Sequence, residues 1–188
     1  MSDALAAEAW AVYQAAECLH DEATVRAAVA RLAKGVSATL AGRNPLLLCP
    51  MTGGVVLAGQ LLPLLDFPLE FDYVHATRYA GALSGGELRW KVIPSTSLAG
   101  RHVLIVDDIL DRGLTLAALV DFCRQQGAAG VHTLVLVDKR CRREAVIEAD
   151  FVGLAAPDRY LFGWGMDYKG YLRNVPGIYA VAGAVADT

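Results

Sequence analysis

Short apolar runs alternate along the chain with longer segments in which apolar residues recur at helical spacing. The runs at residues 46–49, 103–106 and 131–137 are rich in Leu, Val and Ile, as in strands buried on both faces of a parallel sheet. Helical patterns over residues 55–65 and 116–126 follow the first two runs. This alternation predicts an α/β fold with a central, mainly parallel sheet flanked by helices.

Both ends of the chain differ from this alternating middle. Residues 3–19 and 21–40 are rich in Ala and have apolar positions at helical spacing, so we expect two N-terminal helices, with Asp21 as the cap of the second. Residues 151–181 contain short apolar runs interrupted by proline and glycine, which indicates a small irregular hood subdomain over the site. The expected single domain, 1–188, comprises N-terminal helices (1–42), a core (43–150) and a C-terminal hood segment (151–188).

A Gly-rich segment separates two strands near the middle of the chain. Residues 69–77 alternate apolar and polar positions, and a second strand is expected over residues 87–93. Arg78 and Tyr79 begin the connection between them. Arms of this kind often serve as lids over a binding site, although an inert hairpin would have the same composition.

Composition limits the class of protein. The 188 residues suffice for one domain, and 55% hydrophobic residues with a mean hydropathy of +0.37 suit a sheet covered on both faces. We expect no membrane span and no signal peptide, because no apolar run has the required length or context. A net charge of -3 and a pI of about 5.8 argue against a general nucleic-acid binder. The four cysteines are far apart in the sequence, which predicts reduced thiols in a cytoplasmic protein.

The chemistry is concentrated in residues 103–115, which read V-L-I-V-D-D-I-L-D-R-G-L-T. The apolar run stops at Asp107 and Asp108, and a turn with Asp111, Gly113 and Thr115 leads into the next helix. Gly113 allows consecutive backbone amides to point into one concavity, and the helix start adds a partial positive charge, so the turn is suited to a phosphate. The alternative is an ordinary strand–helix turn with an Asp cap.

The Asp pair does not suit phosphate, because like charges repel. Adjacent carboxylates suit the vicinal hydroxyls of a sugar or a hydrated Mg²⁺, so this stretch predicts a ribose 5-phosphate site. A second Gly turn, at residues 50–54, follows another strand and either holds a second anion or is a plain tight turn. Asp138 to Arg140 follow a third strand, at the same ligand-binding edge; with Arg142 and Arg143 they could instead form a solvated basic cluster.

Residues 103–115 closely resemble the phosphoribosyl pyrophosphate (PRPP) motif of type I phosphoribosyltransferases. Between residues 150 and 173 the order Asp-Phe-Val-Gly, Pro-Asp, Asp-Tyr and Tyr-x-Arg looks like the C-terminal block of the hypoxanthine-guanine enzymes. The resemblance extends from residue 46 to about residue 178 and implies the type I phosphoribosyltransferase fold with its hood. It also implies purine salvage: transfer of the 5-phosphoribosyl group from PRPP to N9 of hypoxanthine or guanine, giving IMP or GMP and pyrophosphate, with Mg²⁺ as cofactor.

The resemblance assigns roles residue by residue. Asp107 and Asp108 match the pair that binds the ribose hydroxyls and organises the metal, and Asp111 matches the general base near purine N7. Lys139 matches the residue that binds purine O6. Asp167 matches a metal ligand on the pyrophosphate side and is also expected among the purine-binding residues.

Further matches complete the expected site. Tyr160 is expected to stack on the base, Leu161 to contact its edge through the backbone, Arg173 to bind pyrophosphate, and Arg78 and Tyr79 to head the lid. The 5′-phosphate loop is expected to comprise Asp111, Arg112, Gly113, Leu114 and Thr115, and the pyrophosphate turn Thr52, Gly53 and Gly54.

Three positions depart from the pattern of the family. Thr52 stands where many relatives have Lys, Arg112 where a Thr is usual, and Arg78 where many have Ser. Two other functions are alternatives: a xanthine-preferring phosphoribosyltransferase, and a regulator that kept the PRPP fold and binds RNA or DNA, which the acidic pI disfavours. The expected partners are PRPP and a 6-oxopurine, with no nucleic acid or membrane, in a homodimer or homotetramer.

Overall fold

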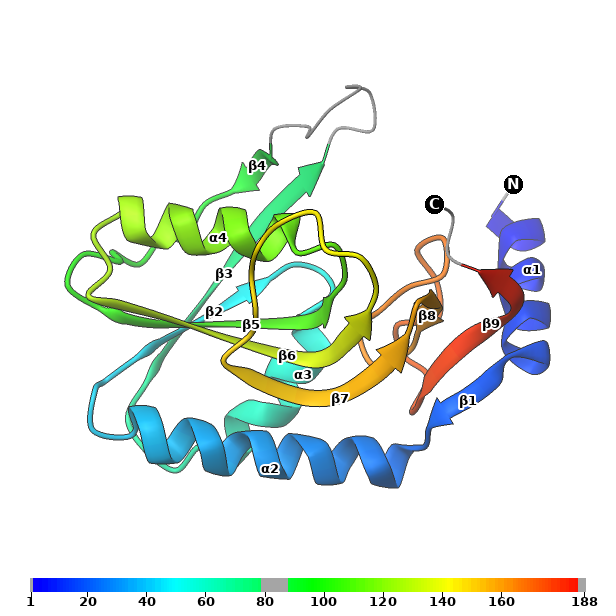
Figure 1. The fold of residues 1–188 in the computed structure, drawn as a ribbon, viewed down its shortest axis with the longest axis horizontal. Coiled ribbons are helices and arrows are strands. Elements are labelled where there is room, and N and C mark those ends of the chain that lie inside the picture. Colours follow the sequence, from blue (N-terminus) through cyan, green and yellow to red (C-terminus); the bar gives the residue numbers. More distant parts are fainter. Residues whose placement is uncertain (1, 79–87, 186–188) are drawn as a thin grey trace.

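Two sheets organise the chain in the computed structural model, which describes residues 2–78 and 88–185 (Figure 1). The helices are α1 (Ser2–Ala15), α2 (Glu22–Leu40), α3 (Val55–Leu61) with a 3-10 turn η1 (Leu62–Leu64), and α4 (Leu114–Gln125). The strands are β1 (Glu17–His20), β2 (Leu46–Pro50), β3 (Glu70–Arg78), β4 (Leu88–Val92), β5 (His102–Leu110), β6 (Gly130–Arg140), β7 (Phe151–Pro157), β8 (Arg159–Phe162) and β9 (Ile178–Val185).

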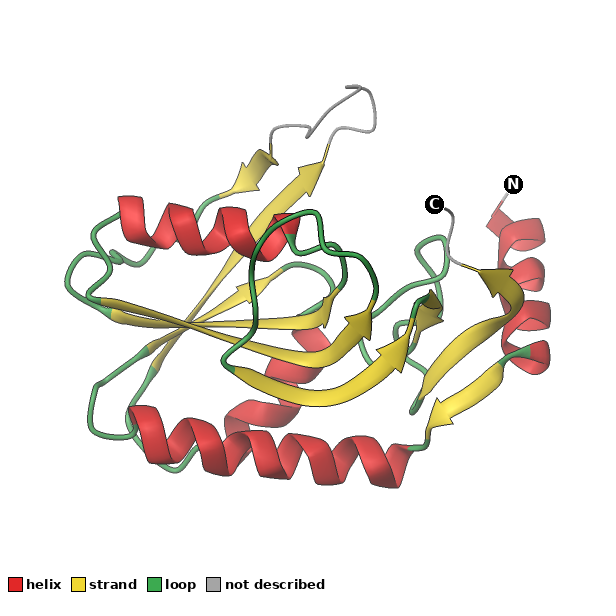
Figure 2. Ribbon diagram, in the orientation of Figure 1, coloured by secondary structure: helices red, strands yellow, loops and turns green. Residues whose placement is uncertain are grey.

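The larger sheet has the order β4-β3-β2-β5-β6-β7, in which only β4 is antiparallel to its neighbour. Helix α4 covers one face, and α2 and α3 cover the other, so the body has three layers (Figure 2). The predicted α/β fold with a mainly parallel sheet is confirmed. No helix in the described part of the chain is long and apolar enough to cross a membrane.

The central strands are apolar throughout because they bury both faces. In β2, Leu47 and Cys49 pack into the core under α2 and α3, whereas Leu46 and Leu48 pack into the core under α4. All four side chains are almost completely buried. Burial of each such side chain contributes about 1.5–3 kcal/mol to folding, which explains why the run has no polar member.

Strands β5 and β6 continue beyond the ends that the apolar pattern predicts. The ladder between them includes Asp107 opposite Val135 and Leu110 opposite Asp138. Backbone pairing does not depend on side-chain polarity, so the strands extend past the first carboxylates. The chemical residues at this edge, including Lys139, are therefore held on strands rather than on a loop.

The N-terminal segment differs from the sequence prediction at one point. The first helix ends at Ala15 instead of continuing to residue 19, and Glu17–His20 form strand β1, which pairs antiparallel with β9. The second helix is confirmed, and so is its cap: the Asp21 side chain accepts a hydrogen bond from the Thr24 amide at 2.8 Å.

The C-terminal segment is less irregular than predicted. Strand β7 is the edge strand of the larger sheet, because its backbone pairs with β6. A separate three-stranded sheet, β1-β9-β8, forms the hood beside the carboxyl ends of the large sheet, with α1 packed on it (Figure 1). Residues 163–177, between β8 and β9, have the irregular structure that the pattern predicts.

Candidate active site

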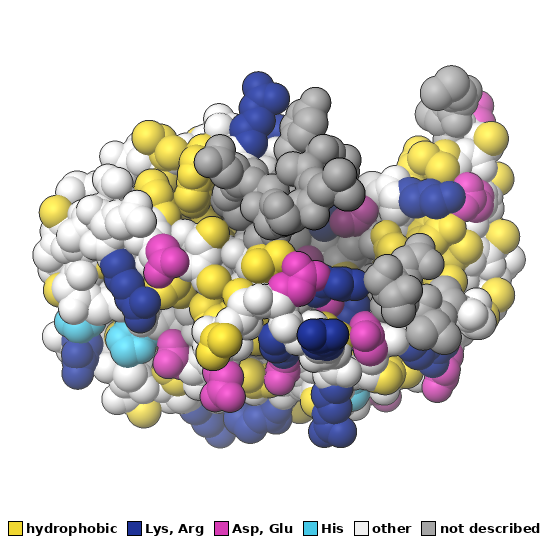
Figure 3. Space-filling model, turned by 45° about the horizontal axis from the view of Figure 1, so that its top comes forward, with side chains coloured by type: hydrophobic (Ala, Val, Ile, Leu, Met, Phe, Trp, Pro, Cys, Tyr) yellow, Lys and Arg dark blue, Asp and Glu magenta, His cyan; other side chains and the backbone are white. Residues whose placement is uncertain are grey.

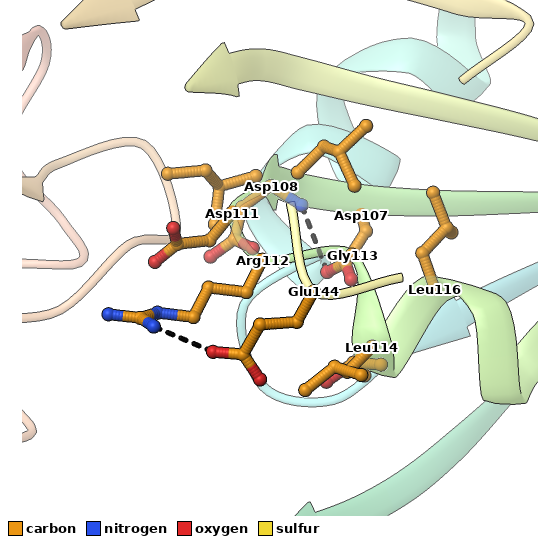
Figure 4. A pocket seen from close by; sticks show the side chains of 11 residues that line it. Asp107, Asp108, Asp111, Arg112, Gly113, Leu114, Leu116 and Glu144 are labelled. Carbon is orange, nitrogen blue, oxygen red and sulfur yellow. Dashed lines mark hydrogen bonds and ion pairs between the residues drawn. The ribbon is translucent and has the colours of Figure 1, made fainter. Parts of the chain in front are cut away.

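The carboxyl ends of β2, β5 and β6 meet at the edge of the large sheet that faces the hood. Acidic and basic side chains gather in the hollow between the two parts (Figure 3). A cavity of about 470 Å³ at this edge is lined by residues 107–116 and Glu144 (Figure 4). A second cavity of about 230 Å³ brings together the turn after β2, both members of the Asp pair, Thr115 and Arg173. The structure therefore places the predicted phosphate loop, acidic pair and pyrophosphate turn side by side.

The acidic pair is held close together at the end of β5. Asp108 is 7% exposed, and its amide donates to Asp107 Oδ1 at 3.0 Å. Burial and the neighbouring charge of Asp108 raise the pKa of Asp107 well above its usual range. Burial also raises the pKa of Asp108, against opposing effects that include the positive charge of Arg173. Two such carboxylates would be stabilised by a cation or by hydroxyl donors.

The turn after β2 packs directly on the acidic pair. A Cβ on Gly53 would lie 2.3 Å from Asp108 Oδ2, and one on Gly54 would lie 2.4 Å from the Val106 oxygen. Both positions therefore require glycine, because the turn approaches the end of β5 so closely. Thr52 is exposed beside them.

The predicted phosphate loop joins β5 to α4. Gly113 caps α4 with φ 84°, in the left-handed region, and a Cβ there would lie 2.8 Å from Ile147 Cγ2. The amide of Glu144 donates to the Arg112 oxygen at 2.9 Å, and the two side chains form an ion pair at 2.6 Å (Figure 4). This pairing raises the pKa of Arg112.

Lys139, on β6, is 6% exposed and lies between two carboxylates. Its Nζ is 3.0 Å from Asp111 Oδ2 and 3.2 Å from Asp158 Oδ1. Cys141 donates to Asp111 Oδ1 at 3.2 Å, and burial together with that carboxylate raises the pKa of the thiol. Asp111, Cys141 and Asp158 offer ligand atoms within 4.8 Å of one another, but the ammonium already pairs with both carboxylates.

Arg143 donates hydrogen bonds to the end of β5, the phosphate loop and β6, and no role in the site was expected for it from the sequence. Its guanidinium donates to the Leu110 oxygen at 3.0 Å, to the Asp111 oxygen and to the Asp138 carboxylate. It therefore ties the phosphate loop to the end of β6. The solvated basic cluster considered from the sequence is wrong for Arg143, whose side chain is only 25% exposed.

The predicted base-binding residues lie on the hood. Tyr160, on β8, is 42% exposed, and its ring lies edge-on to Tyr168 with 5.7 Å between the centroids. Leu161, next on the strand, is buried. Tyr160 therefore presents an accessible aromatic surface, as a stacking residue requires.

Asp167 and Arg173 lie in the segment between β8 and β9 that approaches the turn after β2. Arg173 forms an ion pair with Asp167 at 2.6 Å and donates to the Gly165 oxygen at 2.5 Å. Gly165, which has φ 105°, approaches so closely that a Cβ there would lie 2.1 Å from the Gly53 oxygen. No role in the site was expected for this glycine from the sequence. Of the predicted lid residues, Arg78 ends β3 and Tyr79 lies outside the described residues.

Comparison with known proteins gives consistent matches. The phosphoribosyl transferase domain family matches residues 16–170. The chain is 33% identical to the hypoxanthine-guanine-xanthine phosphoribosyltransferase of Tritrichomonas foetus, over 84% of this chain and 87% of the relative. It is 35% identical to the hypoxanthine-guanine phosphoribosyltransferase of Streptococcus pneumoniae, with the same coverage of each chain. A third relative, the bifunctional protein TilS/HprT of Listeria innocua, is 36% identical over 79% of this chain, which spans only 23% of that longer protein.

Solved structures match the fold at similar identity. The crystal structure of a hypoxanthine phosphoribosyltransferase from Staphylococcus aureus superimposes with a TM-score of 0.83 at 27% identity, covering 88% of this chain and 90% of the other. The fold therefore agrees with the type I phosphoribosyltransferase fold implied by the PRPP motif. From the domain match and the relatives that it spans almost completely, the chain belongs to the phosphoribosyl transferase family.

Proposed function

We propose that this protein is a purine salvage enzyme that transfers the 5-phosphoribosyl group of PRPP to N9 of hypoxanthine or guanine, releasing pyrophosphate and IMP or GMP. The observation that carries the proposal is the convergence, at one sheet edge, of the acidic pair, the Gly113 loop and the Gly53 turn. The acidic pair suits the hydroxyls of a sugar, and the two turns offer backbone amides to two anions, as a ribose with a 5′-phosphate and a pyrophosphate requires.

The acidic pair fits both the sugar and a divalent cation. Asp107 and Asp108 are adjacent carboxylates whose pKa values are raised by burial, so a cation or hydroxyl donors would relieve an unfavourable charge. We assign Asp107, Asp108 and Asp167 as the residues that hold Mg²⁺, directly or through water. The ion would supply charge neutralisation for the departing pyrophosphate.

Anion binding is divided between two turns. Amides at residues 111–115 and the start of α4 are assigned to the 5′-phosphate. Amides of Gly53 and Gly54, together with the Arg173 guanidinium, are assigned to pyrophosphate, for which a planar fork of donors is well suited. We keep Arg78 and Tyr79 as a proposed lid that would exclude water from the activated ribose.

The base is assigned to the space between the hood and β6. Tyr160 stacks on the purine, the Leu161 backbone meets its edge, and Lys139 donates to O6. Asp111 accepts the proton from the imidazole ring of the purine as N9 attacks the ribose carbon and the bond to pyrophosphate breaks. An ammonium donor favours a 6-oxo group, because a 6-amino group offers no comparable acceptor.

The test is pyrophosphate release from PRPP with a panel of hypoxanthine, guanine, xanthine and adenine. We expect turnover with the 6-oxopurines and little with adenine. Absence of turnover with every base would refute the proposal. A dominant rate with xanthine would instead favour a xanthine-preferring phosphoribosyltransferase. The name of the Tritrichomonas foetus relative includes xanthine among its substrates.

A Lys139→Ala variant tests the assignment of the base site. Loss of a buried charged donor should raise the KM for hypoxanthine by about tenfold or more, because hydrogen bonds to charged groups contribute about 1.5–3 kcal/mol. The KM for PRPP should change little. An unchanged purine KM would contradict the O6 assignment.

We also propose that the protein acts in the cytoplasm as a homodimer or homotetramer. The support is the Ala-rich helix α1, on which Trp10 remains 58% exposed. Light scattering coupled to size-exclusion chromatography tests the assembly, and a monomer at micromolar concentration would contradict it.

A further inference from the structure

Lys139 is held by a second carboxylate that has no assigned role. Asp158 lies immediately after β7, and the pairing of Lys139 with Ala156 and of Arg140 with Pro157 brings it beside β6. Its Oδ1 is 3.2 Å from Lys139 Nζ, close to the 3.0 Å between Nζ and Asp111 Oδ2. The ammonium is thus fixed by carboxylates from two separate segments.

Lys139 is far less exposed than Asp111 and Asp158, the two carboxylates that pair with it. The Lys139 side chain is 8% exposed, whereas those of Asp111 and Asp158 are 46% and 47% exposed. A buried ammonium requires partners, and an ammonium has three donor hydrogens. The two carboxylates pair with the ammonium at 3.0 and 3.2 Å, and its three donor hydrogens outnumber these partners, so a donor remains for an oxygen of the substrate.

The two carboxylates differ in what the proposed reaction does to them. Asp111 accepts a proton from the purine and so loses its negative charge while the bond to N9 forms. Asp158 keeps its charge throughout, so it alone pairs with Lys139 at that point. The other groups that face this cluster are Cys141, which donates to Asp111, and Arg143, which donates to the backbone oxygen of Asp111.

We propose that Asp158 is a positioning residue that holds the Lys139 ammonium at purine O6 and thereby sets the preference for 6-oxopurines. The inference rests on the proposed function, because it takes Lys139 as the donor to O6. It assigns Asp158 no contact with the reacting atoms.

The experiment compares Asp158→Asn with wild type. The amide has nearly the size of the carboxylate but no charge, so it weakens the hold on Lys139 without opening a cavity. We expect the KM for hypoxanthine to rise about fivefold to tenfold, since charge-assisted hydrogen bonds are stronger than neutral ones and partial exposure reduces the effect. The KM for PRPP should stay within about twofold, because the Lys139 ammonium is assigned to the purine and not to PRPP.

Two further variants control for charge and for general effects on the fold. Asp158→Glu restores the carboxylate and should recover at least part of the purine KM. Glu70→Gln removes a carboxylate of similar exposure, 55%, from the ion pair with Arg101 at the amino end of β3, and should change neither KM. Thermal unfolding of each variant reports any loss of stability.

The outcomes separate this inference from the proposed function. If wild-type protein turns over no purine with PRPP, the proposed function fails. If wild type is active and Asp158→Asn leaves the hypoxanthine KM unchanged, the inference alone fails. An equal rise in both KM values together with a lower melting temperature would show a purely structural role and would also overturn it.

Discussion

Gly165 joins the hood to the turn after β2, and its replacement by alanine tests how the two parts of the site are held together. The residue has φ 105°, a backbone conformation that residues with a side chain rarely adopt. A Cβ there would lie 2.1 Å from the Gly53 oxygen and 3.4 Å from Asp108 Cβ. The substitution therefore strains the backbone and pushes against the amide turn assigned to pyrophosphate.

The free-energy cost of Gly165→Ala has two parts, backbone strain and the close contact with Gly53. The backbone strain costs about 1–3 kcal/mol. Real Cβ atoms keep at least 3.0 Å from such neighbours, so the two segments must separate by about 0.9 Å, and overpacking of this kind costs about 1–3 kcal/mol. We expect Gly165→Ala to lower the free energy of unfolding by about 2–6 kcal/mol. A misplacement of about 1 Å at Gly53 should lower kcat/KM for PRPP by about 100-fold.

Two other glycines serve as matched controls. Gly170 also has positive φ, 88°, but nothing lies within 4 Å of its Cβ position, so Gly170→Ala should show the strain alone, about 1–3 kcal/mol, with near-normal kinetics. Gly59 lies within helix α3 with open space around it, so Gly59→Ala should stabilise the protein by about 0.5–1 kcal/mol.

Urea unfolding measures the free-energy differences, and steady-state rates at varied PRPP concentration measure the effect on the site. Melting temperature should fall by about 2–4 °C for each kcal/mol in a chain of this size. If Gly165→Ala were no worse than Gly170→Ala in both measurements, the contact between the hood and the turn would not have the importance argued from its geometry.

Three further changes have distinct expected results. Asp107→Asn should abolish most activity but raise the free energy of unfolding near neutral pH, because burial raises the folded-state pKa of the carboxyl and its ionised form therefore destabilises the fold. The gain should vanish below the ordinary carboxyl pKa of 3.8, and a less stable variant in urea unfolding near pH 7 would be contrary evidence. Gly113→Ala should raise the KM for PRPP by about tenfold or more through positive φ and contact with Ile147, and unchanged kinetics would count against the phosphate loop. Arg112→Ala should raise that KM less than about fivefold, because the guanidinium is paired with Glu144 and half exposed; a larger rise would mean that Arg112 leaves its partner for phosphate.

The parallel core could be predicted because its signal is local. A strand such as Leu46–Pro50 buries both faces, and this requires an unbroken apolar run wherever the strand stands in the sheet. The ends of β5 and β6 could not be predicted in the same way. They depend on backbone pairing between the two strands, as between Asp107 and Val135, and this pairing does not depend on the side chain.

Elements and residues defined by distant partners were the ones missed. Glu17–His20 continue a helical pattern but pair with β9, so the information that makes them a strand lies at the other end of the chain. Asp158 and Gly165 were visible as a Pro-Asp pair and as a break in an apolar run. Their contacts with Lys139 and with Gly53 arise only when separate segments meet.

The small sheet of the hood joins strands from opposite ends of the chain, β1 and β9, as Figure 1 shows. During synthesis from the N-terminus, all six strands of the large sheet are available once residue 157 has left the ribosome, whereas the small sheet must wait for residue 185. The large sheet, which carries the loop assigned to the 5′-phosphate, can therefore pair its strands before the small sheet of the hood forms. A nascent chain halted before residue 178 would contain every strand of the large sheet and would lack β9.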